Sequence, residues 1–135
     1  MIHGIGSDIV EYARIELMWT RYGGRFAERI LSGRELPAFK SSLHQARFLA
    51  KRFAAKEAFA KAVGSGLRDP VSLRRISVVH DGFGKPVLQF DRVLGAHLTQ
   101  LGIRGHHLSI SDERNVIIAF VVLEASGMIV PLTKS

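Results

Sequence analysis

The 135-residue chain contains no cysteine. This absence excludes disulfide bonds, cysteine-ligated zinc and a cysteine nucleophile. The chain also has no apolar run long enough to span a membrane, and its N-terminus lacks the basic, apolar and small-residue segments of a signal peptide. We therefore expect a cytoplasmic protein with no role at a membrane.

Repeats, low-complexity segments and linkers are absent as well. Hydrophobic residues make up 47% of the chain, which is enough to form a core. A chain of this length without an internal linker predicts a single domain. We place this domain at residues 1–124 and expect a loose tail at residues 125–135.

The net charge of +7 is unevenly distributed. Residues 14–75 carry 14 Lys and Arg against 5 Asp and Glu, whereas the rest of the chain carries 5 against 7. A basic half of this kind indicates a polyanionic partner, which could be nucleic acid, an acidic protein or a phosphorylated ligand. A solvated surface that keeps the protein soluble would also explain the charge, and charge alone slightly favours this interpretation.

The hydrophobic pattern predicts an α+β fold, in which a mostly antiparallel sheet packs against a long central helix and shorter helices. The helix at residues 43–63 is the strongest feature, because good helix formers dominate it and Gly64 follows it. Ser32 and Glu35 have the spacing of a capping box for a short helix. Further helices are expected at residues 11–22 and 91–101, and strands at residues 2–8, 72–80, 85–90, 107–111 and 116–124.

Two of these strands have unusual faces. In residues 2–8, alternation puts Gly4 and Gly6 on the same face as Asp8, and the glycines leave that face open to another backbone or a ligand. Residues 116–123 are apolar on both faces, which predicts a central, buried strand.

Asp8 and Glu57 are the carboxylates of greatest interest. Asp8 ends the first strand, and Glu57 lies within the basic helix. If the fold brings them together, they form a site for a divalent cation and a phosphate-rich ligand, because Mg²⁺ is usually held by one or two carboxylates plus substrate phosphates. Glu57 and Lys61 are also an i, i+4 pair, worth roughly 0.2–0.5 kcal/mol as a surface salt bridge. Spacing alone favours that salt bridge.

Two further rows of side chains allow two interpretations each. His107, Ser109 and Ser111 share one strand face, which could line a ligand cleft or be the wet face of an antiparallel sheet, the latter being the commoner case. A second row suits docking on an acidic helix but equally describes an ordinary basic helix face. It consists of Arg14, Met18 and Arg21, extended by Arg25 if helical geometry resumes past Gly23 and Gly24.

Three ordered segments resemble the holo-acyl-carrier-protein synthases, the small bacterial 4′-phosphopantetheinyl transferases. The first is Gly-Ile-Gly-Ser-Asp-Ile-Val-Glu at residues 4–11, followed by Arg14. The second is Arg-Phe-Ala-Ala-Lys-Glu-Ala-Phe-Ala-Lys-Ala at residues 52–62 with Gly-Ser-Gly at 64–66, and the third is His-Leu-Ser-Ile-Ser-Asp-Glu-Arg at residues 107–114 with Ala119 and Glu124. Many relatives have Ser-His where this chain has Ser111-Asp112.

The resemblance implies an enzyme of fatty acid biosynthesis that transfers the 4′-phosphopantetheine arm of coenzyme A to a serine of apo acyl carrier protein. The other product is adenosine 3′,5′-bisphosphate, and Mg²⁺ bridges the enzyme carboxylates and the pyrophosphate. The family also implies a homotrimer whose active sites lie between subunits. The seryl proton would go to Glu57 or to a metal-oriented water, with the water favoured. A basic RNA-binding module is the rival function, but it leaves the paired carboxylates unexplained and no aromatic-rich strand supports it.

Site residues follow from the resemblance by position. Asp8 and Glu57 would hold the metal and, with Lys61, form the catalytic group. The coenzyme A site would include Lys61 at the phosphates, Arg52 and His107 near the nucleotide, and Phe53, Gly64, Ser65, Gly66 and Ser109 beside the ligand. The acidic carrier protein would be bound by Arg14, Met18, Arg21 and Arg25.

Overall fold

The computed structural model describes residues 1–126, so most of the predicted tail lies outside the described residues. Strands and helices follow in the order β1 (Ile2–Glu11), α1 (Tyr12–Tyr22), α2 (Gly24–Ile30), α3 (Leu36–Ser41), α4 (Gln45–Val63), a 3-10 turn (Leu73–Arg75), β2 (Ile76–His80), β3 (Pro86–Phe90), α5 (Arg92–Gln100), β4 (Ile103–Asp112) and β5 (Val116–Ala125). None of the helices in this part of the chain has the length and hydrophobicity needed to cross a membrane.

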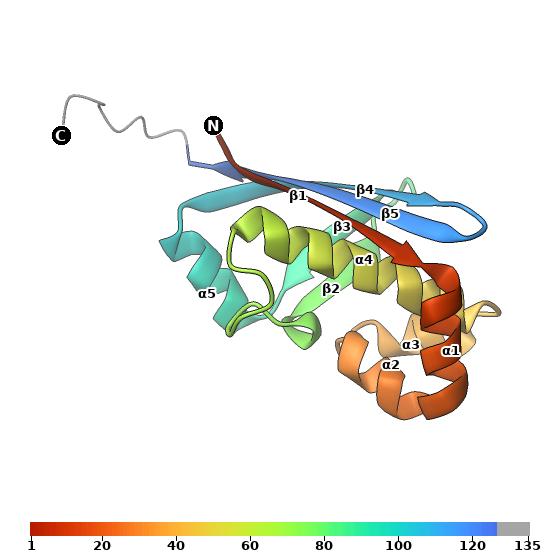
Figure 1. The fold of residues 1–135 in the computed structure, drawn as a ribbon. Coiled ribbons are helices and arrows are strands. Elements are labelled where there is room, and N and C mark those ends of the chain that lie inside the picture. The colour runs from red at the N-terminus through yellow and green to blue at the C-terminus, as the bar shows by residue number, and fades with distance from the viewer. Residues whose placement is uncertain (127–135) are drawn as a thin grey trace, which may run out of the picture.

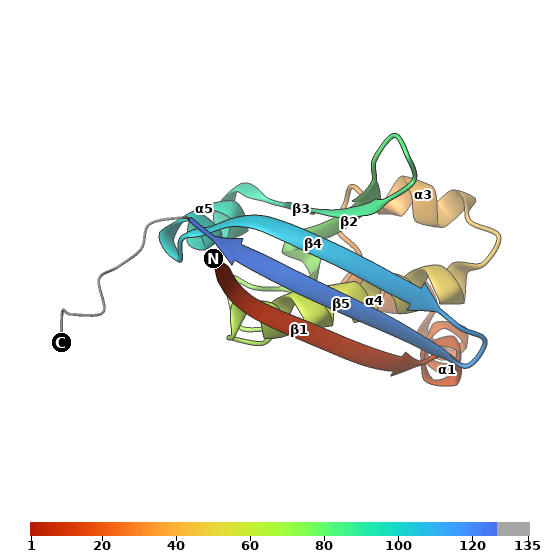
Figure 2. The same cartoon turned by 90° about the horizontal axis from the view of Figure 1, so that it is seen from above.

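The fold is α+β, as predicted, with two antiparallel sheets. The larger sheet has the strand order β1-β5-β4, and β2 pairs with β3 in a hairpin. Helix α4 runs beneath the larger sheet, α1, α2 and α3 gather near one end of α4, and α5 lies near the other (Figure 1). Seen from above, the outer face of the larger sheet carries no helix or strand from residues 1–126 (Figure 2).

Two local predictions are wrong. Residues 73–75 form a 3-10 turn rather than the start of a strand, and the Leu73 carbonyl accepts a hydrogen bond from Lys56 Nζ instead of a strand partner. Ser32 and Glu35 do not cap a helix in the expected way. The Ser32 N–H donates to Glu35 Oε1, but the Ser32 hydroxyl pairs with Ser77 and α3 begins only at Leu36, just before Pro37.

Strand β1 lies directly against the backbone of α4. An added Cβ at Gly4 would overlap the carbonyl oxygen of Ala62, and one at Gly6 would overlap that of Ala58. The sequence-based expectation of a close backbone approach at these glycines is therefore confirmed. Because β1 and α4 meet so closely here, the position of Asp8 relative to α4 is fixed.

Strand β5 is central, as predicted, but it is buried on one face only. Ile117, Ala119, Val121 and Leu123 point into the core, whereas Ile118 is 36% exposed and Phe120 is 45% exposed. Ile9 of β1 pairs with Ile118 and is 67% exposed on the same outer face. The apolar side chains on the second face of β5 are therefore not covered by any element within residues 1–126.

Gly6→Ala tests the contact between β1 and α4. We expect the free energy of unfolding to fall by about 1–3 kcal/mol, because the new methyl group overlaps a backbone carbonyl that cannot move independently. Urea unfolding followed by circular dichroism measures the loss. Gly95→Ala is the matched control, since an added Cβ meets nothing there and Gly95 lies inside α5. This control should gain roughly 0.5–1 kcal/mol, and an equally harmless Gly6→Ala would contradict the contact.

Candidate functional site

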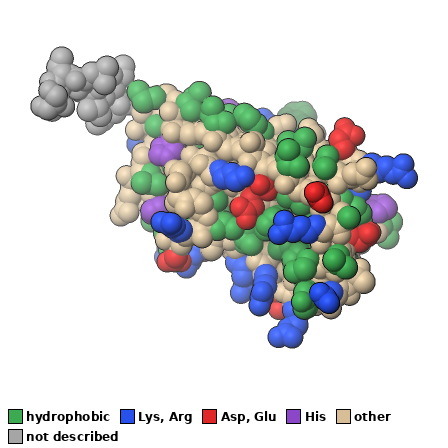
Figure 3. Space-filling model, in the orientation of Figure 1, with side chains coloured by type: hydrophobic (Ala, Val, Ile, Leu, Met, Phe, Trp, Pro, Cys, Tyr) green, Lys and Arg blue, Asp and Glu red, His purple; other side chains and the backbone are tan. Residues whose placement is uncertain are grey.

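A hollow of about 380 Å³ lies where β1 meets α4 and α1. Asp8 comes from β1, Glu57 and Lys61 from α4, and Arg14 and Met18 from α1, with Phe53 also in the wall. We call it the Asp8 hollow. On the face seen in Figure 3, acidic side chains lie at the centre among Lys and Arg side chains, and hydrophobic ones line the upper edge. The fold thus brings together residues 8 and 57, which are far apart in the chain.

Lys61 pairs with Asp8 rather than with Glu57. Its Nζ lies 3.0 Å from Asp8 Oδ1 and donates to the Ser7 carbonyl oxygen, also at 3.0 Å. The i, i+4 salt bridge favoured by spacing alone is not formed. Lys61 instead fixes a positive charge at the carboxylate contributed by β1.

Glu57 has an environment that disfavours its charge. Burial raises the pKa of its carboxyl group, the negative charge of Asp8 raises it further, and Lys61 acts in the opposite direction. The two carboxylates are therefore close enough to repel each other. A cation bound between them would remove this repulsion, so the donor set fits a divalent ion.

The donor set also matches the way in which Mg²⁺ is held. Within residues 1–126 there is no group of three or more His, Cys, Asp or Glu that could enclose a metal ion. A pair of carboxylates leaves the remaining positions to water and to substrate oxygens, which Mg²⁺ prefers over an all-protein cage.

The basic row predicted on the first helix extends from the Asp8 hollow. Met18 also lines a second hollow of about 330 Å³, together with Arg25 and Arg29 of α2. Helical geometry resumes at Gly24, after the turn at Gly23, so Arg25 extends the row as anticipated. The Arg21 guanidinium lies 5.9 Å from the ring centroid of Tyr22 and lines neither hollow.

Several predicted ligand-binding residues lie away from the Asp8 hollow. Arg52 points into the core, where its Nε lies 3.5 Å from Glu35 Oε2 and its guanidinium lies over the ring of Phe48. His107 projects from the outer sheet face and pairs with Glu124 at 2.8 Å. The remaining ones are Ser109, on the same strand as His107, and Gly64, Ser65 and Gly66, just past the end of α4.

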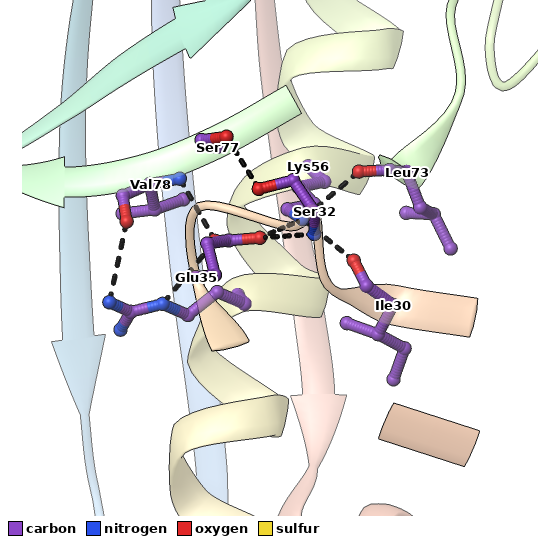
Figure 4. A network of polar contacts seen from close by, with 8 residues as sticks. Ile30, Ser32, Glu35, Lys56, Leu73, Ser77 and Val78 are labelled. Atoms are coloured by element: carbon purple, nitrogen blue, oxygen red, sulfur yellow. Dashed lines mark hydrogen bonds and ion pairs between the residues drawn. The ribbon is translucent and has the colours of Figure 1, made fainter. Parts of the chain in front are cut away.

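A buried ion network around Glu35 was not predicted from the sequence (Figure 4). Lys56 is completely buried and donates to Glu35 Oε1, Ile30 O and Leu73 O. Glu35 Oε2 accepts from the Val78 N–H. Burial lowers the pKa of Lys56 to about 8, and the charge of Glu35 opposes that shift. Phe59 and Ala60, three and four positions after Lys56, were the available signal, because they put Lys56 on an apolar helix face.

Comparisons with known proteins identify the family of this chain. A model of the 4′-phosphopantetheinyl transferase superfamily matches residues 4–121. The holo-[acyl-carrier-protein] synthase of Nitrosospira multiformis is 54% identical over 92% of this chain and 99% of its own length. The chain belongs to the holo-acyl-carrier-protein synthase family. The resemblance of its three motifs is therefore confirmed.

Solved structures of the family share the fold. The synthase of Neisseria meningitidis has a TM-score of 0.89 and 48% identity, covering 92% of this chain and 99% of that one. The synthase of Bacillus anthracis, solved in complex with CoA (3′,5′-ADP), has a TM-score of 0.78 and 41% identity, covering 93% and 99%.

Glu57→Gln should stabilise the fold at pH 7. The unfolded chain ionises Glu57 near its usual pKa of 4.5, whereas the folded chain holds its proton to higher pH. Stability is therefore lost as the pH rises through this window, and the amide avoids the loss. Urea unfolding at pH 7 and pH 4 measures the difference, which should vanish at pH 4. Glu113→Gln in the exposed β4–β5 turn is the control, and a destabilised Glu57→Gln at pH 7 would refute the repulsion.

Proposed function

We propose that this protein transfers 4′-phosphopantetheine from coenzyme A to a serine of an acidic apo acyl carrier protein in a Mg²⁺-dependent reaction. The products are holo acyl carrier protein and adenosine 3′,5′-bisphosphate, and the setting is cytoplasmic fatty acid biosynthesis. The observation that carries the proposal is the meeting of Asp8, Glu57 and Lys61 in one hollow beside a basic helix. The structures of the Bacillus anthracis and Helicobacter pylori synthases, both solved with coenzyme A or its fragment, support it.

Asp8, Glu57 and Lys61 divide between two roles in the Asp8 hollow. Asp8 and Glu57 would hold Mg²⁺, which when bound would offset the charge of the pyrophosphate. Lys61 keeps a positive charge beside the leaving group, where negative charge develops. The seryl oxygen forms a bond to the β-phosphorus, and the bridging oxygen leaves with the electron pair of the broken bond.

The seryl proton needs an acceptor. A carboxylate that binds a cation has a lowered proton affinity, so Glu57 is a poor base while it holds the metal. We assign the proton to a water molecule. The rate acceleration then comes from positioning and fixed charge, as in other phosphoryl transfers.

Glu57→Gln should abolish transfer, because the amide cannot replace a carboxylate at the cation. Purified protein is incubated with apo carrier protein, coenzyme A and Mg²⁺, and the carrier is weighed by mass spectrometry. Glu113→Gln should retain full activity. If Glu57→Gln still modifies the carrier, its role as a metal ligand is wrong. If the unaltered protein gives no mass gain but binds RNA tightly, the RNA-binding module is the better function.

We infer that Arg14, Met18, Arg21 and Arg25 bind the carrier protein. Arg14 and Met18 border the Asp8 hollow, so a protein docked on α1 and α2 would present its serine there. Arg14→Glu should raise the KM for the carrier at least tenfold and leave the KM for coenzyme A unchanged. The effect should weaken with salt, because the Debye length is about 8 Å at physiological ionic strength. Arg104→Glu, an equal charge reversal at an exposed site outside this surface, is the control, and a shift in the KM for coenzyme A would contradict docking.

We also propose a homotrimer whose sites lie between subunits. The outer sheet face exposes Ile5, Ile9, Ile118 and Phe120, and contiguous apolar patches mark interaction sites. The predicted ligand residues His107 and Ser109 are exposed on β4, away from the Asp8 hollow, which supports a neighbour that completes the site.

Phe120→Glu should convert the trimer to monomers and remove activity, because it places a charge in an apolar interface. Sedimentation velocity measures the mass. Phe83→Glu is the matched control, since Phe83 is 99% exposed at the tip of the β2–β3 hairpin. Co-expression of Glu57→Gln with His107→Ala subunits should restore part of the activity that each variant lacks. Monomeric wild-type protein, or no restoration, would rule out shared sites.

A further inference from the structure

A hollow of about 530 Å³, separate from the Asp8 hollow, is lined by four arginines. Arg34 follows α2, Arg74 and Arg75 lie in the 3-10 turn, and Arg92 begins α5. We call it the arginine hollow. It shares no lining residue with the Asp8 hollow, so it is not part of the site described above.

The charge in the arginine hollow is only partly compensated. Asp91 is its one carboxylate, and it pairs with Arg75 at 2.9 Å. Arg34 donates to the uncharged Gln89. Arg74 and Arg92 are exposed and form no ion pair with any residue in the range 1–126. Four guanidinium groups therefore surround this space against one carboxylate.

Two buried hydroxyl groups also line the hollow. Ser32 Oγ and Ser77 Oγ lie 2.6 Å apart, and the residues are only 6% and 5% exposed. One hydrogen bond between two hydroxyls uses one of their two protons. The second proton has no acceptor among the described residues, and a buried donor without an acceptor is costly.

We propose that the arginine hollow binds a compact, multiply charged oxyanion of the phosphate class, such as a pyrophosphate group. Such a ligand accepts a hydrogen bond from the remaining hydroxyl O–H and is surrounded by the arginines, whose planar guanidinium groups match phosphate oxygens. An acidic protein surface fits less well, because only a small group can reach hydroxyls that are more than nine-tenths buried. The pyrophosphate group could belong to free inorganic pyrophosphate or to a nucleoside diphosphate.

Ligand binding in the arginine hollow would stabilise the contacts of α4, the helix that carries Glu57. The hydroxyl of Ser32 lines the hollow, while its N–H donates to Glu35, which holds Lys56 of α4. A ligand on Ser32 therefore strengthens the segment that anchors α4. We expect it to raise the midpoint of thermal unfolding.

Calorimetric titration with inorganic pyrophosphate, without Mg²⁺ and at low salt, tests the proposal. The double variant Arg74→Ala/Arg92→Ala should bind at least tenfold more weakly than the wild type or lose one site. Arg68→Ala/Arg104→Ala removes the same charge from exposed positions outside the hollow and should bind like the wild type. The Asp8 hollow is intact in all three proteins, so binding there cannot produce this difference.

Further arms separate the alternatives. Ser77→Ala should weaken pyrophosphate binding severalfold, because it removes a hydroxyl from the pair without changing any charge. Titration with ADP shows whether the ligand is free pyrophosphate or a nucleotide. A nucleotide is indicated if the wild type binds ADP more tightly than pyrophosphate and the Arg74→Ala/Arg92→Ala variant loses that binding. Equal pyrophosphate affinity in both double variants overturns the proposal. The proposal is also overturned if the Arg74→Ala/Arg92→Ala variant changes only the KM for carrier protein, because this surface would then belong to protein docking.

Discussion

The contact between β1 and α4 positions the whole candidate site. Gly4 and Gly6 allow the strand to lie against the carbonyl groups of Ala62 and Ala58, at a distance that no side chain on the strand would permit. Asp8 is the next residue on the same face of the strand, and it therefore faces α4 where Lys61 projects. The small residues of both elements thus determine where the first carboxylate lies.

The Glu35 network holds the same helix from another direction. Lys56 is tied to the end of α2 through Ile30, to the 3-10 turn through Leu73, and to Glu35. Because Glu57 is the next residue along α4, any rotation of the helix that moved Glu57 would break these hydrogen bonds. Removing one partner of such a buried pair leaves an uncompensated charge, at a cost of about 3–5 kcal/mol. The helix is therefore fixed both where it contacts β1 and where it contacts α2.

Hydrophobic periodicity and glycine placement predicted the elements well, because both act locally. The end of α4 at Val63 follows from such a signal, because Gly64 terminates the helix. The partner of Lys61 could not be predicted in this way. Local spacing offered Glu57, whereas Asp8 becomes available only when residues 53 positions apart meet. Glu35 shows the same limit, since its capping-box spacing concealed contacts with α4 and β2.

The apolar side chains on both faces of β5 likewise depend on contacts that local sequence does not specify, in this case contacts between subunits. One face packs on α4, and a sequence pattern of this kind normally means that a second layer covers the other face. Within the described chain no second layer exists, and the uncovered face also carries His107. A neighbouring subunit on this face would bury Phe120 and bring residues of one chain near the acids of another. A single arrangement would then account for the hydrophobic pattern of β5 and for the separation of the predicted ligand residues within one chain.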